Sequence, residues 1–169
     1  MTSNSESKEL VITREFKAPR DLVFKAWSEA EHLKHWWGPK GFEITVKGLD
    51  FRPNGFFHYS MQSPDGGQMW GKFVYREIQP NEKIVWLNCF SDEEGNIVRA
   101  PFSDLIPLEI HNEVTFSETN SITTITLRSR PNNATKEEQS FFEGMFESME
   151  QGFGGTFDQL EQYLEERRS

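Results

Sequence analysis

The sequence is poor in cysteine, in clustered basic residues and in long apolar runs. Cys89 is the only cysteine among 169 residues, which excludes an intramolecular disulfide and a cysteine zinc site. No run approaches the roughly 18 apolar residues of a membrane-spanning helix, and the polar start MTSNSESKEL lacks the apolar core of a signal peptide. We therefore expect a cytoplasmic protein that does not associate with membranes.

Charge and motif content exclude several further classes of function. The net charge of −9 and the absence of a Lys/Arg cluster argue against nucleic-acid binding. The glycines of GFGG lie inside a predicted helix and do not link a strand to a helix, so they do not form a phosphate-binding loop. No serine or cysteine nucleophile motif is present. We assign no catalytic residue, no metal site and no cofactor.

Aromatic residues are abundant, and the C-terminal part of the chain carries a strong helical pattern. The sequence contains 15 Phe and 5 Trp, which indicates a deep aromatic core or an aromatic-lined cavity. Thr135 and Glu138 have the spacing of a capping box, and apolar residues then recur every three or four positions up to Leu164. This predicts one helix over residues 135–167, about 48 Å long. Such a helix needs a broad apolar surface to cover its stripe.

The remaining chain supplies that surface as a series of strands. Residues 9–17 alternate as a strand and precede two short helices, the second of which we expect to begin with a capping box at Ser28 and Glu31. Strands are predicted at 42–51, 56–61, 68–78, 83–90, 109–116 and 122–130, with an irregular segment at 91–107. Strands clustered between helices indicate an α+β fold. We expect one domain over residues 9–167 and a disordered tail over 1–8.

The order of these elements and four local strings resemble the START-like, or SRPBCC, superfamily. The strings are REFKAPRDLVFKAWSEAEHLKHWWGP, FRPNGFFHYSMQSPDG, YREIQPNEKIVW and GFGGTFDQLEQYL. Within it the chain is most similar to the activator of 90-kDa heat-shock protein ATPase homologue-like domains. The resemblance implies a helix-grip fold, in which a curved antiparallel sheet wraps the C-terminal helix around a cavity. It transfers no catalytic residue, because the family shares no catalytic motif.

The resemblance implies binding of a small hydrophobic or aromatic molecule in that cavity. Two alternatives are a chaperone-activating interaction module, with a heat-shock chaperone as partner, and a polyketide cyclase or hydratase-like enzyme. Whether the protein is a monomer or a homodimer stays open. The candidate ligand-binding residues combine aromatic and adaptable thioether side chains; for each one, plain core packing is the alternative. They are Trp37, Phe57, Tyr59, Met61, Trp70, Phe73, Tyr75, Trp86, Met145, Met149 and Phe153.

The histidines invite metal or acid–base interpretations, which we weigh against ordinary surface positions. His32 and His35 lie three residues apart, but no further ligands accompany them, so we interpret them as solvated helix residues. His111 alternates with Glu109 and Glu113 along one strand face. We interpret this row as solvent-facing; the alternative is a general base in the cavity. The alternation places His58 on the face opposite Phe57 and Tyr59.

Two arginines and a glycine cluster remain open in their meaning. Arg52 and Arg99 lie near turns that could border the cavity mouth, where either side chain could pair with an anionic ligand. Gly152, Gly154 and Gly155 each cost the helix about 1 kcal/mol relative to alanine. They leave room either for a ligand or for close approach of the backbone to a neighbouring element.

Overall fold

Alternating apolar and polar residues form antiparallel strands that are framed by two pairs of helices. The computed structural model describes residues 9–38, 41–100 and 104–168, with side chains through residue 166. The predicted disordered segment 1–8 lies outside the described residues. In chain order the elements are β1 (Leu10–Phe16), α1 (Arg20–Ser28), α2 (Ala30–Trp36), β2 (Glu43–Asp50), β3 (Phe56–Gln62), β4 (Gln68–Gln79), β5 (Lys83–Ser91), β6 (Ile97–Val98), β7 (Glu109–Thr119), β8 (Ile122–Asn132), α3 (Lys136–Gly144) and α4 (Phe146–Arg168).

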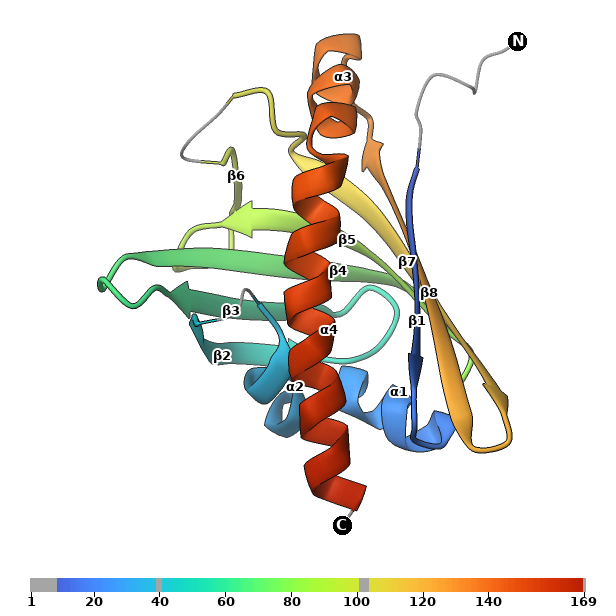
Figure 1. The fold of residues 1–169 in the computed structure, drawn as a ribbon. Helices are drawn as coiled ribbons and strands as arrows, with labels where there is room; N and C mark the ends of the chain where they lie inside the picture. Colours follow the sequence, from blue (N-terminus) through green and yellow to red (C-terminus); the bar gives the residue numbers. More distant parts are fainter. Residues whose placement is uncertain (1–8, 39–40, 101–103, 169) are drawn as a thin grey trace, which may run out of the picture.

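The strands form one eight-stranded sheet in the order β1-β8-β7-β5-β4-β3-β2, with β6 paired to β5. Each of these strand pairs is antiparallel. Register shifts between Val46 and Gly48 and between Tyr75 and Glu77 bend the strands locally. Figure 1 shows the sheet curving around α4, which crosses its concave face. The predicted α+β helix-grip fold is therefore confirmed.

The strand predictions agree with the structure within a few residues, whereas β6 was not predicted. Its two residues, Ile97 and Val98, pair with Ser91 and Phe90 of β5. A strand this short has no periodicity of its own, and only its tertiary partner defines it. The turns follow the expected chemistry, because Asn54, Asn81 and Asn120 adopt the left-handed conformation.

The predicted single C-terminal helix is wrong in one respect, because it is interrupted at Met145. The Met145 backbone N–H bonds to Phe142, three residues back, which tightens the turn between α3 and α4. Gly144 weakens the helix at the same place. The predicted capping box at the start of α3 is confirmed: Thr135 and Glu138 exchange both hydrogen bonds.

The capping box predicted at Ser28 is also wrong. Ser28 is the last residue of α1, and its hydroxyl donates to the Lys25 carbonyl at 3.1 Å. This bond to the preceding turn competes with a cap on the following helix. Glu29 occupies the N-cap of α2 instead, without a side-chain hydrogen bond.

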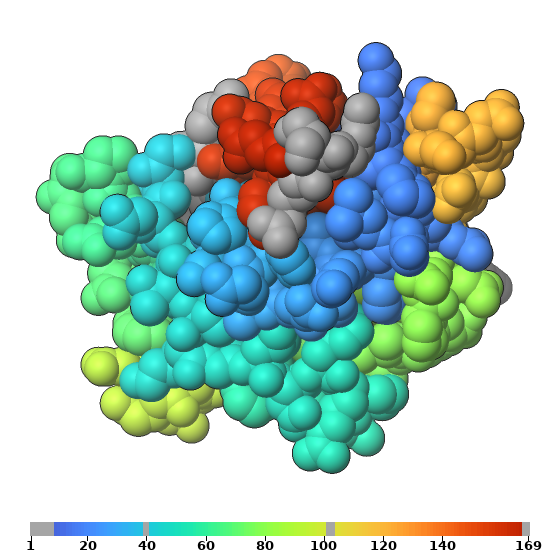
Figure 2. Space-filling model, turned by 90° about the horizontal axis from the view of Figure 1, so that it is seen from below, coloured from blue at the N-terminus to red at the C-terminus, as the bar shows by residue number. Residues whose placement is uncertain are grey.

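Aromatic rings from the short helices and the sheet form the main core. The Trp27 ring of α1 lies 4.8 Å from Trp36 and 5.7 Å from Trp86, measured between centroids. Phe73 and Trp86 stack at 4.8 Å on adjacent strands. Viewed from below, α1 and α2 cover this end of the molecule beside the C-terminal turns of α4 (Figure 2). The core thus fills the space between the sheet and the short helices.

Hydrogen bonds and ion pairs connect the C-terminal half of α4 to neighbouring elements. Thr156 donates its hydroxyl hydrogen to the Gly38 carbonyl at 2.9 Å, and Gln159 donates to the same oxygen at 3.0 Å. On the other side of the helix, Arg14 of β1 forms ion pairs with Asp158 at 2.6 Å and Glu161 at 2.9 Å. Among the described residues, no helix is long and apolar enough to cross a membrane.

Candidate functional site

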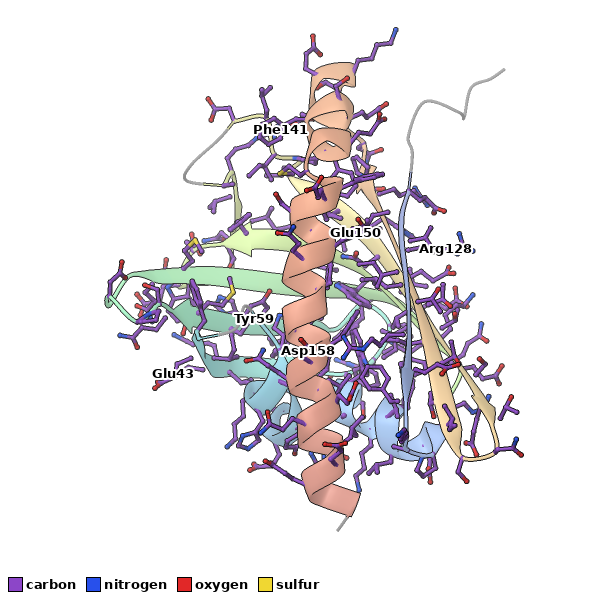
Figure 3. The ribbon with its side chains drawn as sticks, viewed as in Figure 1. Glu43, Tyr59, Arg128, Phe141, Glu150 and Asp158 are labelled. Carbon is purple, nitrogen blue, oxygen red and sulfur yellow. The ribbon has the colours of Figure 1, made fainter. Side chains whose placement is uncertain are left out.

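The concave face of the sheet brings together most of the predicted ligand-binding residues. Six of them project from strands β3, β4 and β5, where residues two apart share a face, and the other two come from the end of α2 and from α4. Figure 3 shows Tyr59 on the side of the sheet that α4 crosses. Six of the residues are buried members of one hydrophobic cluster and the other two pack against it. They are Trp37, Phe57, Tyr59, Phe73, Tyr75 and Trp86, with Met61 and Phe153.

Three predicted residues lie elsewhere. Trp70 is on the convex face, because it lies an odd number of positions from Phe73 along β4; its ring contacts His58 at 5.1 Å and the Lys47 ammonium group at 5.4 Å. Met145 and Met149 are half-buried on the side of the helix nearest α3 and do not belong to the cluster.

A small cavity lies at the edge of the aromatic cluster, between the sheet and the segment that precedes β7. Its volume is about 60 Å³, which corresponds to about two water molecules at the density of the liquid. A Cβ on Gly71 would lie 2.6 Å from the Tyr59 ring, so this glycine allows the ring to lie flat against β4. The cavity is lined by Tyr59, Met61, Gly71, Asn88, Cys89, Phe90, Ile106, Pro107 and Ile110.

Three polar side chains interrupt the apolar concave face, and the sequence analysis missed them. Asn88, Asn112 and Ser129 come from the adjacent strands β5, β7 and β8. Asn112 is 3% and Ser129 is 1% exposed. The Oδ1 atoms of Asn88 and Asn112 and the Oγ atom of Ser129 are buried without a hydrogen-bond partner in the described part of the chain. Each lies at a position of its strand where the alternation calls for an apolar residue. This interruption of the alternation is the sequence feature from which the three residues could have been found.

Two aromatic side chains add buried polar atoms to the same region. The Tyr75 hydroxyl and the Trp86 Nε1 atom also have no partner among the described residues. Burial raises the pKa of Tyr59 to about 12, only partly offset by the Trp37 indole. Burial likewise raises the pKa of Tyr75. Both phenols therefore stay protonated near neutral pH, where they can donate hydrogen bonds and cannot abstract protons.

The segment beside the cavity is tied to α3 through Arg99. The Arg99 Nη1 atom forms an ion pair with Glu138 and donates to the Ile106 carbonyl at 3.3 Å. Arg52 pairs with Asp50 at 2.8 Å. Both arginines thus have acidic partners within the chain.

The histidines lie outside the cavity. His32 is buried, not solvated as predicted, because it packs between Glu29, at 3.1 Å, and Tyr163 of α4. His58 projects from the convex face, where its Nε2 atom contacts the Asp92 carbonyl oxygen at 3.0 Å. His111 is half-buried on the convex face, and burial lowers its pKa. No group of three potential metal ligands occurs within residues 9–38, 41–100 and 104–168.

The glycines of α4 do not serve a close backbone contact at the two positions where their surroundings are described. A Cβ added to Gly152 or to Gly154 would meet no atom within 4 Å. The interpretation as a close approach is therefore wrong at these positions. None of the described cavities is lined by them either.

Solved structures from several bacteria share this fold along nearly the whole chain. A protein from Arthrobacter aurescens has a TM-score of 0.79 and 27% identity, over 98% of this chain and 90% of that one. A protein from Nitrosomonas europaea has a TM-score of 0.76 and 25% identity, over 98% and 99%. One from Mycobacterium smegmatis has a TM-score of 0.76 and 23% identity, over 98% and 96%; at that identity the likeness concerns the fold alone.

The search of curated proteins finds no match. In contrast, the sequence model described as "Activator of Hsp90 ATPase homolog 1-like protein" matches residues 17–165. That range contains every helix and strand of the described chain except β1, which ends at Phe16, and the last three residues of α4. The chain belongs to the family of activator of Hsp90 ATPase homolog 1-like proteins.

Proposed function

We propose that this protein binds a small, largely apolar or aromatic molecule between the concave face of the sheet and α4. The observation that carries this proposal is the cavity at the edge of the aromatic cluster, bordered by Tyr59, Met61 and Ile110. Family membership supports it, because members share a fold in which sheet and helix enclose an interior.

A ligand with an aromatic ring needs more room than the cavity of about 60 Å³ provides. The neighbouring residues are suited to make that room. Met61 lines the cavity and is half-buried, and methionine side chains repack at low cost. Ile106 and Pro107 border the cavity on a segment whose tie to α3 is the Arg99–Glu138 ion pair. We expect the ligand to enlarge the cavity by displacing these side chains.

An enzymatic role of the cyclase or hydratase kind has less support. It requires a buried acid or base beside the substrate. Tyr59 is the titratable side chain of the cavity that carries a hydroxyl, and its raised pKa suits hydrogen-bond donation. Cys89 also borders the cavity, and burial raises its pKa to about 12, which disfavours the thiolate. Binding without turnover fits these groups better.

A chaperone interaction is the alternative that the family description suggests. It needs a surface for a protein partner, and it makes no use of the cavity. Co-purification with an Hsp90-type chaperone and stimulation of its ATPase by the full chain would favour this alternative. Neither effect should appear if the cavity alone accounts for the function.

The proposal is tested by filling the cavity. Ile110→Phe adds a ring at the cavity wall, and Val11→Phe makes a similar change at a 43%-exposed position of β1. We expect apolar aromatic compounds to raise the melting temperature of the wild type and of Val11→Phe, and to lose this effect on Ile110→Phe. Equal ligand effects on all three proteins would place the binding elsewhere and contradict the proposal.

A further inference from the structure

Three polar side chains on the concave face each have an oxygen atom without a hydrogen-bond partner in the described part of the chain. Asn112 lies directly opposite both Trp86 of β5 and Ser129 of β8 in the strand registers. Side chains paired in this way lie about 5 Å apart at Cβ. Asn88 follows Trp86 by two positions on β5, on the same face, and lines the cavity. We call Asn88, Asn112 and Ser129 the polar row.

A buried polar group without a hydrogen bond destabilises a fold, and the large majority of such groups in proteins are paired. The polar row leaves the Oδ1 atoms of both asparagines and the Oγ atom of Ser129 unpartnered within the described chain, beside the free Nε1 atom of Trp86. Four such atoms lie on adjacent strands, and one of them belongs to Asn88, which lines the cavity. This is the pattern of a site that forms hydrogen bonds with a ligand.

The charges on the concave face restrict the chemical class of the ligand. The concave-face positions of β1, β5, β7 and β8 carry two charged side chains. Arg14 is ion-paired with Asp158 and Glu161. Glu118, exposed at the far end of β7, accepts a hydrogen bond from the Arg20 backbone N–H at 2.8 Å. Burying an ionised group without a counter-charge is strongly unfavourable. The polar row therefore has no charge to offer to a carboxylate, a phosphate or an ammonium group.

We propose, building on the proposed function, that the polar row recognises an uncharged polar group, with both donor and acceptor atoms, on an otherwise aromatic ligand. The asparagine oxygens accept hydrogen bonds, while the Ser129 hydroxyl and the Trp86 indole donate them. A primary amide has the matching set of atoms. The aromatic part of the ligand then lies toward Tyr59 and Phe73, whose rings are 5.9 Å apart at their centroids.

The test uses three probes of one shape: 2-naphthamide, 2-naphthoate and 2-methylnaphthalene. They differ only in whether the substituent is a neutral hydrogen-bonding group, a charge or a methyl. We expect calorimetric titration of the full chain to show 2-naphthamide binding at least about tenfold more tightly than either of the others, because a site with buried polar groups rejects analogues that leave them unpaired.

Variants assign that preference to the polar row. Ser129→Ala and Asn112→Leu are expected to lower the affinity for 2-naphthamide about tenfold, while 2-methylnaphthalene binds as before or more tightly. Thr126→Ala, on the opposite face of β8, is the matched control and should leave all three affinities unchanged. Ser129→Ala is the smaller change, and thermal unfolding of each variant confirms that it folds.

The outcomes separate this inference from the proposed function. If the wild type binds the amide and 2-methylnaphthalene equally, or if the preference survives in both variants, the polar row holds only water and the inference is wrong, while cavity binding stands. If none of the three probes binds the wild type, the proposed function fails along with it.

Discussion

At the scale of the residue, Glu138 serves two contacts at once. One carboxylate oxygen accepts from the Thr135 backbone N–H at 2.9 Å and closes the capping box, and the other pairs with Arg99. The side chain is 9% exposed. Glu138 therefore links the start of α3 to the segment that borders the cavity.

This arrangement makes the stability dependent on pH. The hydrogen bond from the Thr135 backbone, with Arg99 and against the effect of burial, holds the pKa of Glu138 below its ordinary value. Its contribution is thus fully present above the unfolded-state pKa, about 4.3, and is lost as the pH falls through the lower folded-state value. We expect Glu138→Gln to be less stable than the wild type by roughly 0.5–1 kcal/mol near neutral pH, with the difference shrinking as the pH falls below the unfolded-state pKa.

Urea unfolding at neutral pH and in acid measures this difference in stability between Glu138→Gln and the wild type. Glu137→Gln, at the exposed neighbouring position in the same helical turn, is the control. A deficit of Glu138→Gln that stays the same in acid, or that Glu137→Gln reproduces, would show that the carboxylate charge is not its cause.

At the scale of the element, α4 has two unlike halves. Its C-terminal half carries the fully buried Phe157 and Leu160 and the bonds to Gly38 and Arg14. Its N-terminal half carries the half-buried Met149 and Phe153 and two glycines, Gly152 and Gly154, at which an added Cβ would meet no atom within 4 Å. The N-terminal half is therefore the less firmly packed one.

Gly152→Ala should stabilise the protein by about 1 kcal/mol, because alanine is the better helix former and its Cβ would meet no atom within 4 Å. Gly71→Ala should destabilise it, because there the new Cβ would lie 2.6 Å from the buried Tyr59 ring. Chemical denaturation of both variants provides the comparison. Loss of stability in Gly152→Ala would mean that this position packs against something after all.

At the scale of the whole molecule, the tryptophan cluster of the short helices and the small cavity lie toward different ends. The short helices and their tryptophans close the end seen in Figure 2. The opposite end contains the cavity, the polar row and the segment tied by Arg99.

Amide hydrogen exchange should reveal this asymmetry directly. We expect peptides from residues 156–164 of α4 to exchange more slowly than peptides from residues 146–153, because protection follows buried contacts. Adding 2-naphthamide should slow the second group while leaving the first unchanged. Uniform exchange along α4, in the presence and absence of the probe, would contradict a flexible half of the helix.

Much of this organisation could be predicted from local patterns. Strand alternation, turn asparagines and the capping box at Thr135 depend on neighbours in the sequence, and the structure confirms them. The helix break at Met145 and the position of Trp70 on the convex face were harder to predict from the sequence. The first depends on how α3 and α4 pack separately, and the second on the phase of β4 relative to the sheet.

By itself, the sequence determined the element order, the family and the aromatic character of the interior, because these follow from residue periodicity and local strings. Only the tertiary structure decided which residues meet across strands. Asn88, Asn112 and Ser129 are 24 and 17 positions apart in the chain, and no local pattern joins them. The register of β5, β7 and β8 places them side by side, and burial makes their missing hydrogen bonds significant.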